Sequence, residues 1–314
     1  MQQSNITSSL LSWYSKEKRA LPFRDIDNPY KIWLSEVMLQ QTQVETVIPY
    51  FERWIKKFPT LEAVANSNQE SLLKIWEGLG YYSRCRNFHK AAKIVVENHC
   101  GNIPNDWDSF RALPSVGDYT AAAVLSMAFQ KPFPLIDGNV KRVIARVLGL
   151  KNLTNRNMSL MKNHLGNIIS QEKPGDFNQS VMELGARVCS PKNPNCGKCP
   201  ISFSCKAFAS GNPELYPTPI KKTKPPHYTI VVGIVWRGEK FYIQKRGEKG
   251  MLAGLWEFPG GKVKKGESLQ DALCREVKEE CGAKPKILKK IGAIKHAYTH
   301  FSITFHGYHC EENI

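Results

Sequence analysis

Apolar residues recur every three or four positions along the first two-thirds of the chain. In residues 44–58 they are Val44, Val47, Ile48, Phe51, Trp54, Ile55 and Phe58. This spacing predicts an amphipathic helix. The same periodicity predicts further helices at residues 72–79, 91–99, 120–129 and 140–148. We therefore predict that this part of the chain is all-helical.

The pattern changes after residues 216–226, a segment rich in proline and lysine that is typical of an exposed linker. Residues 229–236 and 240–246 predict two strands around the turn Arg237-Gly238-Glu239. Residues 269–280 have a helical period, and alternation returns at residues 301–305. We predict two domains: residues 1–215, all-α, and residues 227–314, a smaller α+β domain, joined by the linker 216–226.

Composition and charge narrow the class of protein. Hydrophobic residues make up 42% of the chain and charged residues 23%, which excludes a disordered or collagen-like protein. No apolar run approaches the roughly 18 residues of a membrane span, and the start lacks the pattern of a signal peptide, so we expect an intracellular protein. The 44 Lys and Arg against 28 Asp and Glu give a net charge of +16, which favours nucleic acid as the partner over a merely solvated basic surface.

Nine cysteines in such a chain favour metal chemistry over disulfides. Five are scattered, whereas Cys189, Cys196, Cys199 and Cys205 are separated by six, two and five residues. Four thiolates in one loop can converge on a tetrahedral or a cuboidal centre, so this spacing predicts zinc or an iron-sulfur cluster.

Two short segments carry candidate binding groups. Residues 113–125, LPSVGDYTAAAVL, place a tight turn before a helix, where free backbone amides form a site for an anion. Asp137 and Gly138 precede another helix, for which Asp137 is at least an N-cap.

Glu36 is the one carboxylate within the otherwise apolar segment WLSEVML, residues 33–39. Burial there would raise its pKa and make it a general acid near neutral pH. The alternative is a glutamate on the solvated face of a helix.

Five segments together resemble a known family over the first 210 residues: LPFRDIDNPYKIWLSEVMLQQTQVETVIPYF, GLGYYSRCRN, LPSVGDYTAAAVL, LIDGNVKRV and the cysteine loop. They are similar to adenine DNA glycosylases of the MutY type, in the endonuclease III superfamily. The resemblance implies a helix-hairpin-helix domain with a 4Fe-4S loop. It also implies that Val116, Gly117 and Lys192 contact DNA phosphate, with Ser115 in place of the first hairpin glycine.

The resemblance also implies roles for individual residues. Glu36 would protonate adenine, Asp137 would face the sugar, and Tyr119 and Asn139 would hold that geometry. Tyr119 stands where lyase relatives carry lysine, which implies a monofunctional glycosylase. The remaining substrate contacts implied are Leu21, Arg24 and Glu183 at the adenine pocket, and Gln41, Thr42 and Tyr81 beside the opposing base.

Residues 258–283 match a Nudix box at every required position. Glu276, Glu279 and Glu280 fall on one helix face, which suits Mg²⁺ bound to a diphosphate. The alternative is a solvated acidic face. In the family this domain recognises the 8-oxoguanine opposite adenine. Tyr298, Thr299 and His300 occupy the position of the loop that contacts this base. We expect the domain to be short for a complete Nudix fold.

We therefore predict a base-excision repair enzyme that hydrolytically removes adenine opposite 8-oxoguanine or guanine in double-stranded DNA. It would be a monomer with no membrane association, in the bacterial cytoplasm near the nucleoid. One alternative is a Mg²⁺-dependent nucleotide pyrophosphatase fused to a helical DNA-binding domain, or both activities in one chain. Another is a non-catalytic DNA-binding protein that keeps the cluster.

Overall fold

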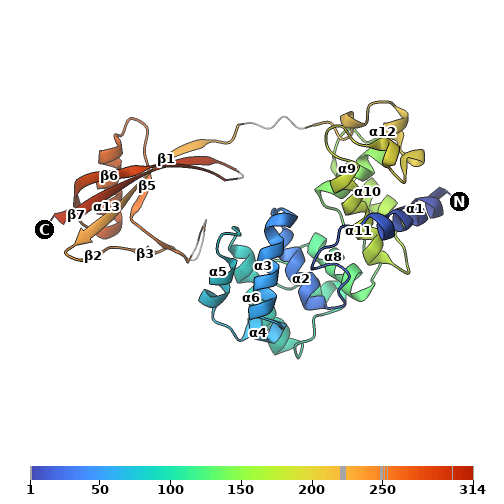
Figure 1. The fold of residues 1–314 in the computed structure, drawn as a ribbon, viewed down its shortest axis with the longest axis horizontal. Coiled ribbons are helices and arrows are strands. Elements are labelled where there is room, and N and C mark those ends of the chain that lie inside the picture. The colour runs from blue at the N-terminus through green and yellow to red at the C-terminus, as the bar shows by residue number, and fades with distance from the viewer. Residues whose placement is uncertain are drawn as a thin grey trace. The chain divides into compact units, whose positions relative to one another are not determined.

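The computed structural model describes residues 2–219, 224–247, 250, 252, 254–298 and 300–313. The chain divides into two compact units, Met1–Ile220 and Lys221–Ile314. The first unit contains helices and the second contains the strands and one further helix (Figure 1).

The helical unit begins with α1 (Gln2–Glu17) and contains helices of 4 to 16 residues. The α-helices that follow are α2 (Pro29–Leu39), α3 (Val44–Lys57), α4 (Leu61–Ala65), α5 (Gln69–Trp76), α6 (Ser83–Asn98), α7 (Trp107–Arg111), α8 (Asp118–Phe129), α9 (Gly138–Leu148), α10 (Asn155–Ile168), α11 (Pro174–Arg187) and α12 (Lys206–Ala209). Three short 3₁₀ helices lie in and after the cysteine loop: η1 (Cys196–Lys198), η2 (Ser202–Ser204) and η3 (Pro213–Leu215).

Two hydrophobic cores stabilise this unit. One is built mainly from α2 to α6, with Trp33, Trp54 and Trp76 fully buried at its centre. The other joins α1 to α9, α10 and α11. Helix α8 contributes side chains to both cores, and Figure 1 shows the two groups of helices on either side of it. The junction between the cores is where the candidate site lies.

The predicted helices are present, with two differences at their ends. Helix α5 ends at Trp76 rather than at residue 79, because the chain turns at Gly78 with a φ of 92°. Helix α6 begins at Ser83, well before residue 91. The apolar pattern did not predict its first two turns because they contain the buried polar residues Arg84 and His89.

The second unit contains β1 (His227–Arg237), β2 (Lys240–Phe241), β3 (Gln244–Lys245), β4 (Trp256–Glu257), β5 (Gly260–Lys262), α13 (Leu269–Cys281), β6 (Lys284–Ala297) and β7 (Ser302–Asn313). The main sheet has the order β2-β1-β7-β6, with β5 also paired to β1. The predicted hairpin is confirmed, since Arg237 pairs with Lys240 across the turn. Strand β1 runs parallel to β7, and α13 packs its Leu273 and Val277 on the sheet.

Candidate active site

Glu36 lies in α2, a helix that is apolar on every side and therefore buried. Only 5% of Glu36 is exposed, and the hydroxyl of Tyr119 donates a hydrogen bond of 2.7 Å to its Oε2. Burial raises the pKa of Glu36 to about 7, which the bond from Tyr119 opposes and the charge of Asp137 reinforces. This carboxyl group can therefore hold a proton near neutral pH, as a general acid must.

Asp137 has two roles at the start of α9. Its Oδ1 accepts a hydrogen bond of 2.6 Å from the amide of Val140, so the residue is the N-cap of the helix. It also lines the same cavity as Glu36. Burial raises its pKa, whereas bonds from the amides of Val140 and Asn139 lower it. The capping bond thus fixes the position of a carboxylate that faces the cavity.

The cavity has a volume of about 300 Å³, at the small end of the range for small-molecule sites. The structure brings together here all the residues predicted for catalysis and for the adenine pocket: Leu21, Arg24, Glu36, Tyr119, Asp137, Asn139 and Glu183. Thr42, predicted beside the opposing base, lines the same cavity.

Arg19 is a functional candidate that sequence analysis missed. Its Nε donates a 2.7 Å bond to Glu183, whose other oxygen accepts from Arg24. Burial alone would raise the pKa of Glu183, which is 1% exposed, but the two arginines lower it. A buried anion between two cations is therefore fixed in the cavity wall. The only signal in the sequence was a basic residue close to the Leu21 to Arg24 segment.

Gln41 and Tyr81 do not line this cavity. They line a second one of about 710 Å³, together with the hairpin residues Ser115, Val116 and Gly117. The amide of Val116 already donates to the carbonyl oxygen of Leu113. An anion at the turn would thus bind at Gly117 and the first turn of α8 instead. Ser115 adopts a φ of 60°, and its hydroxyl accepts a hydrogen bond from Asn87.

The four clustered cysteines line one small cavity beside α9. Burial raises the pKa of Cys199 to about 12 and raises those of Cys196 and Cys205, so free thiolates there would be unfavourable without a cationic centre. The charges of Cys189, Cys196 and Cys205 also raise the pKa of Cys199, so the four thiols lie near one another. Lys192 is exposed in the same loop.

Two arginines of α9 connect this loop to the active site. Arg142 donates to the side-chain oxygen of Asn139 at 2.8 Å and to the carbonyl oxygen of Cys189 at 2.8 Å. Arg146, almost fully buried, donates to the sulfur of Cys189 at 3.2 Å. The loop and the residues around Asp137 are therefore held by one hydrogen-bonded network.

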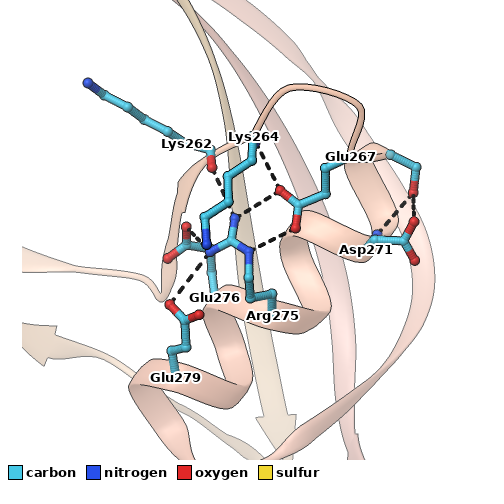
Figure 2. A network of polar contacts seen from close by, with 8 residues as sticks. Lys262, Lys264, Glu267, Asp271, Arg275, Glu276 and Glu279 are labelled. Carbon is cyan, nitrogen blue, oxygen red and sulfur yellow. Dashed lines mark hydrogen bonds and ion pairs between the residues drawn. The ribbon is translucent and has the colours of Figure 1, made fainter.

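The carboxylates of the Nudix box are engaged by an arginine (Figure 2). Arg275 forms two hydrogen bonds to Glu267, one of 2.7 Å to Glu276, and an ion pair of 3.5 Å with Glu279. Glu280 accepts a 2.8 Å bond from the amide of Gly260. Among the described residues of this unit, no group of three or more acids is placed to hold a metal ion. The acidic face is thus ion-paired rather than merely solvated, and the Mg²⁺ site stays a prediction.

Of the loop predicted to contact 8-oxoguanine, Tyr298 and His300 are described and Thr299 lies outside the described residues. The ring of Tyr298 packs 4.9 Å from that of Phe301 and 4.6 Å from that of His296. This aromatic group closes the β6–β7 hairpin, and its role in base recognition stays a prediction.

Comparisons with known proteins identify the family of this chain. Residues 34–166 match the model of the HhH-GPD superfamily base excision DNA repair proteins, and residues 231–314 match the NUDIX domain model. The mouse adenine DNA glycosylase is 35% identical over 96% of this chain and 69% of its own length. Its counterpart in Buchnera aphidicola of Schizaphis graminum is 33% identical over 94% of this chain and 84% of its own.

Solved structures show the same helical fold. A thermostable thymine-DNA glycosylase aligns with a TM-score of 0.62 and 27% identity, over 67% of this chain and 97% of that one. A trapped covalent intermediate of endonuclease III with DNA aligns with a TM-score of 0.56 and 23% identity, over 65% of this chain and 94% of that one.

The fold and site define a DNA glycosylase of the helix-hairpin-helix superfamily with a C-terminal Nudix domain. The chain belongs to the adenine DNA glycosylase family. None of its described helices is long and apolar enough to cross a membrane.

Proposed function

We propose that this chain removes adenine paired with 8-oxoguanine or guanine from double-stranded DNA, by hydrolysis of the N-glycosidic bond. The observation that carries the proposal is the buried Glu36 with the Tyr119 hydroxyl 2.7 Å from its Oε2. The mouse and Buchnera relatives that match 96% and 94% of this chain are adenine DNA glycosylases.

Glu36 supplies the proton that this reaction needs. The adenine anion is a poor leaving group, so protonation at N7 by the neutral carboxyl lets the bond from C1′ to N9 break. A pKa of about 7 leaves a large share of the acid form at neutral pH. The sugar then develops positive charge, as in glycoside hydrolysis.

Asp137 offsets that positive charge from across the cavity. Its position is fixed by the bond to Val140, and Asn139 donates to its other oxygen at 3.4 Å. Tyr119 has no amine that could attack C1′, so the enzyme would leave an abasic site and would not form a Schiff base. Water then completes the hydrolysis.

Adenine must leave the base stack to reach this cavity, at a cost of a few kcal/mol. We propose that Gln41 and Tyr81 enter the duplex and offset part of this cost, and that Arg24, Arg19 and Glu183 form the polar wall that meets the base. Tyr298, Thr299 and His300 are proposed to meet the opposing 8-oxoguanine.

We propose that Cys189, Cys196, Cys199 and Cys205 hold a 4Fe-4S cluster with a structural role. Support comes from the cavity that the four thiols share and from the charges of the other three, which raise the pKa of Cys199. The choice of an iron-sulfur cluster over zinc follows from the resemblance of the cysteine spacing to the loop of this family. The cluster would hold Lys192 toward DNA phosphate.

The test is single-turnover adenine release from a duplex with adenine opposite 8-oxoguanine, using adenine opposite thymine as the control. The proposal expects release from the mispair and none from the control. Glu36→Gln separates the proposal from a Mg²⁺-dependent nucleotide pyrophosphatase, because it would abolish adenine release and leave diphosphate hydrolysis unchanged. Hydrolysis of oxidised nucleotides without adenine release would contradict the proposal.

A further inference from the structure

Arg84 is a charged side chain that the chemistry above does not use. It lies in the first turn of α6 and is only 7% exposed. Burial lowers the pKa of its guanidinium to about 10, so the group still carries its charge at neutral pH. A buried cation is costly unless its donors are satisfied. The Nε of Arg84 has no partner among the described residues, so its hydrogen bonds come from Nη1 and Nη2.

One side of the guanidinium closes the loop after α2. Its Nη1 donates to the carbonyl oxygens of Met38 at 2.7 Å and Gln40 at 2.5 Å, where the last turn of a helix leaves carbonyls without partners. Its Nη2 donates to the hydroxyl of Thr42 at 3.1 Å. Gln41 lies between two bonded neighbours and adopts a φ of 58°, a conformation that is unusual for any residue but glycine.

The other side closes the loop after α5. Nη2 also donates to the carbonyl oxygen of Gly80 at 3.2 Å, which accepts a second bond from the indole of Trp76 at 3.0 Å. Tyr81 follows with a φ of 48°, and its ring centroid lies 5.2 Å from the guanidinium carbon. This distance permits a cation-π interaction.

Each loop therefore contains a residue with an exposed side chain and a strained backbone, Gln41 in one and Tyr81 in the other. The guanidinium of Arg84 forms hydrogen bonds to both loops. Backbone strain of this kind persists only where surrounding contacts over-determine it. A planar guanidinium can supply donors in two directions at once, whereas a lysine ammonium is a compact point charge. Gln41 and Tyr81 border the same cavity together with Arg84.

We propose that Arg84 is a positioning residue that sets Gln41 and Tyr81 at a fixed distance and direction from each other, so that they enter the DNA as one rigid unit. This inference rests on the proposed function, because it assigns Arg84 to the step in which adenine leaves the stack. It acts through the two loops and touches neither the adenine nor Glu36.

The experiment compares the wild type with Arg84→Lys on a duplex that carries 2-aminopurine next to the adenine opposite 8-oxoguanine. We expect a smaller rise in fluorescence on binding and a loss of about 100-fold in the single-turnover rate. The pH at which the rate falls should not move, since the surroundings of Glu36 are unchanged. In a Gln41→Ala, Tyr81→Ala background, Arg84→Lys should change the rate by no more than about twofold.

His89→Gln is the matched control. His89 is another buried polar residue of α6, 4% exposed, and its backbone hydrogen bonds involve Ala65 and Ser67, outside both loops. It should lower the unfolding temperature and leave the fluorescence rise intact. If Arg84→Lys does not fold, glycine at positions 41 and 81 should restore its folding, because glycine adopts positive φ without strain.

A full effect of Arg84→Lys in the double-alanine background, or failure of the two glycines to restore folding, would overturn the inference. So would an unchanged fluorescence rise and rate in Arg84→Lys itself. If the wild type releases no adenine from the mispair, the proposed function fails instead, and the two failures are thereby distinguished.

Discussion

Glu36 in the glycosylase cavity and Glu267 in the Nudix box are both glutamates, but their environments shift their pKa values in opposite directions. Glu36 is buried among apolar side chains and has its pKa raised to about 7. Glu267 is bonded to Arg275, which lowers its pKa to about 2. The difference shows that a carboxyl becomes an acid for catalysis where burial comes without a cation, and a fixed anion where an arginine reaches it.

The largest expected difference between the two regions is in adenine release. Glu36→Gln keeps the size of the side chain and an oxygen to accept from Tyr119, but removes the proton donor. The single-turnover rate should fall by about 10²–10⁴-fold. Glu276→Gln in the Nudix box is the matched control and should leave the rate within about twofold. Equal losses from both variants would show that the two regions do not have the separate roles assigned to them.

Asp137→Asn separates the capping role of Asp137 from the role of its charge in the cavity. Asparagine is as good an N-cap as aspartate, so the start of α9 and the stability should be preserved. The charge that offsets the sugar would be lost, and the rate should fall by about 10²–10³-fold. Denaturant unfolding measured beside the rate distinguishes the two effects, and a parallel loss of stability would assign Asp137 to capping alone.

Stability should respond to pH in opposite directions in the two regions. Because the pKa of Glu36 rises on folding from 4.5 to about 7, the folded state binds the extra proton. Its unfavourable contribution therefore appears as pH rises through this window and is complete above pH 7. Glu36→Gln should be more stable than the wild type at pH 8 by roughly 3 kcal/mol, and should lose this advantage near pH 4.5.

Glu267 has the reverse dependence, because its lowered pKa gives stability that is present above pH 4.5 and is lost as pH falls toward 2. Chemical denaturation of the wild type, Glu36→Gln and Glu267→Gln at pH 4.5 and pH 8 measures how the contribution of each glutamate to stability changes with pH. If the stability of Glu36→Gln relative to the wild type did not increase with pH, the raised pKa of Glu36 would be contradicted.

The smallest expected effect comes from Arg275→Met. It removes the cation that holds Glu267, Glu276 and Glu279, so amides of α13 should exchange hydrogen faster and the second unit should unfold a few degrees lower. The rate of adenine release should keep the same dependence on pH as in the wild type. Unchanged exchange in α13 would show that the ion pairs add nothing to the stability of this unit.

The sequence predicted the parts of this molecule that depend on neighbours in the chain. The apolar residues around Glu36 left burial and a solvated helix face as alternatives, and the structure shows burial, whereas the capping by Asp137 followed from the helix after it. Helix α6 was predicted too short because Arg84 and His89 are buried through contacts with distant segments.

The pairing of Arg19 with Glu183 joins residues 164 positions apart, so no local pattern could reveal it. The same holds for the bond from Arg142 to Cys189, which joins residues 47 positions apart. Such contacts depend on tertiary packing, which propensity and periodicity do not encode.

The most direct test of the central claim is the pH dependence of single-turnover adenine release by the wild type between pH 5 and pH 9. A neutral Glu36 as the proton donor predicts a rate that is constant at low pH and falls about tenfold per pH unit above an inflection near 7. A rate that is flat across this range, or that rises with pH, would contradict the account.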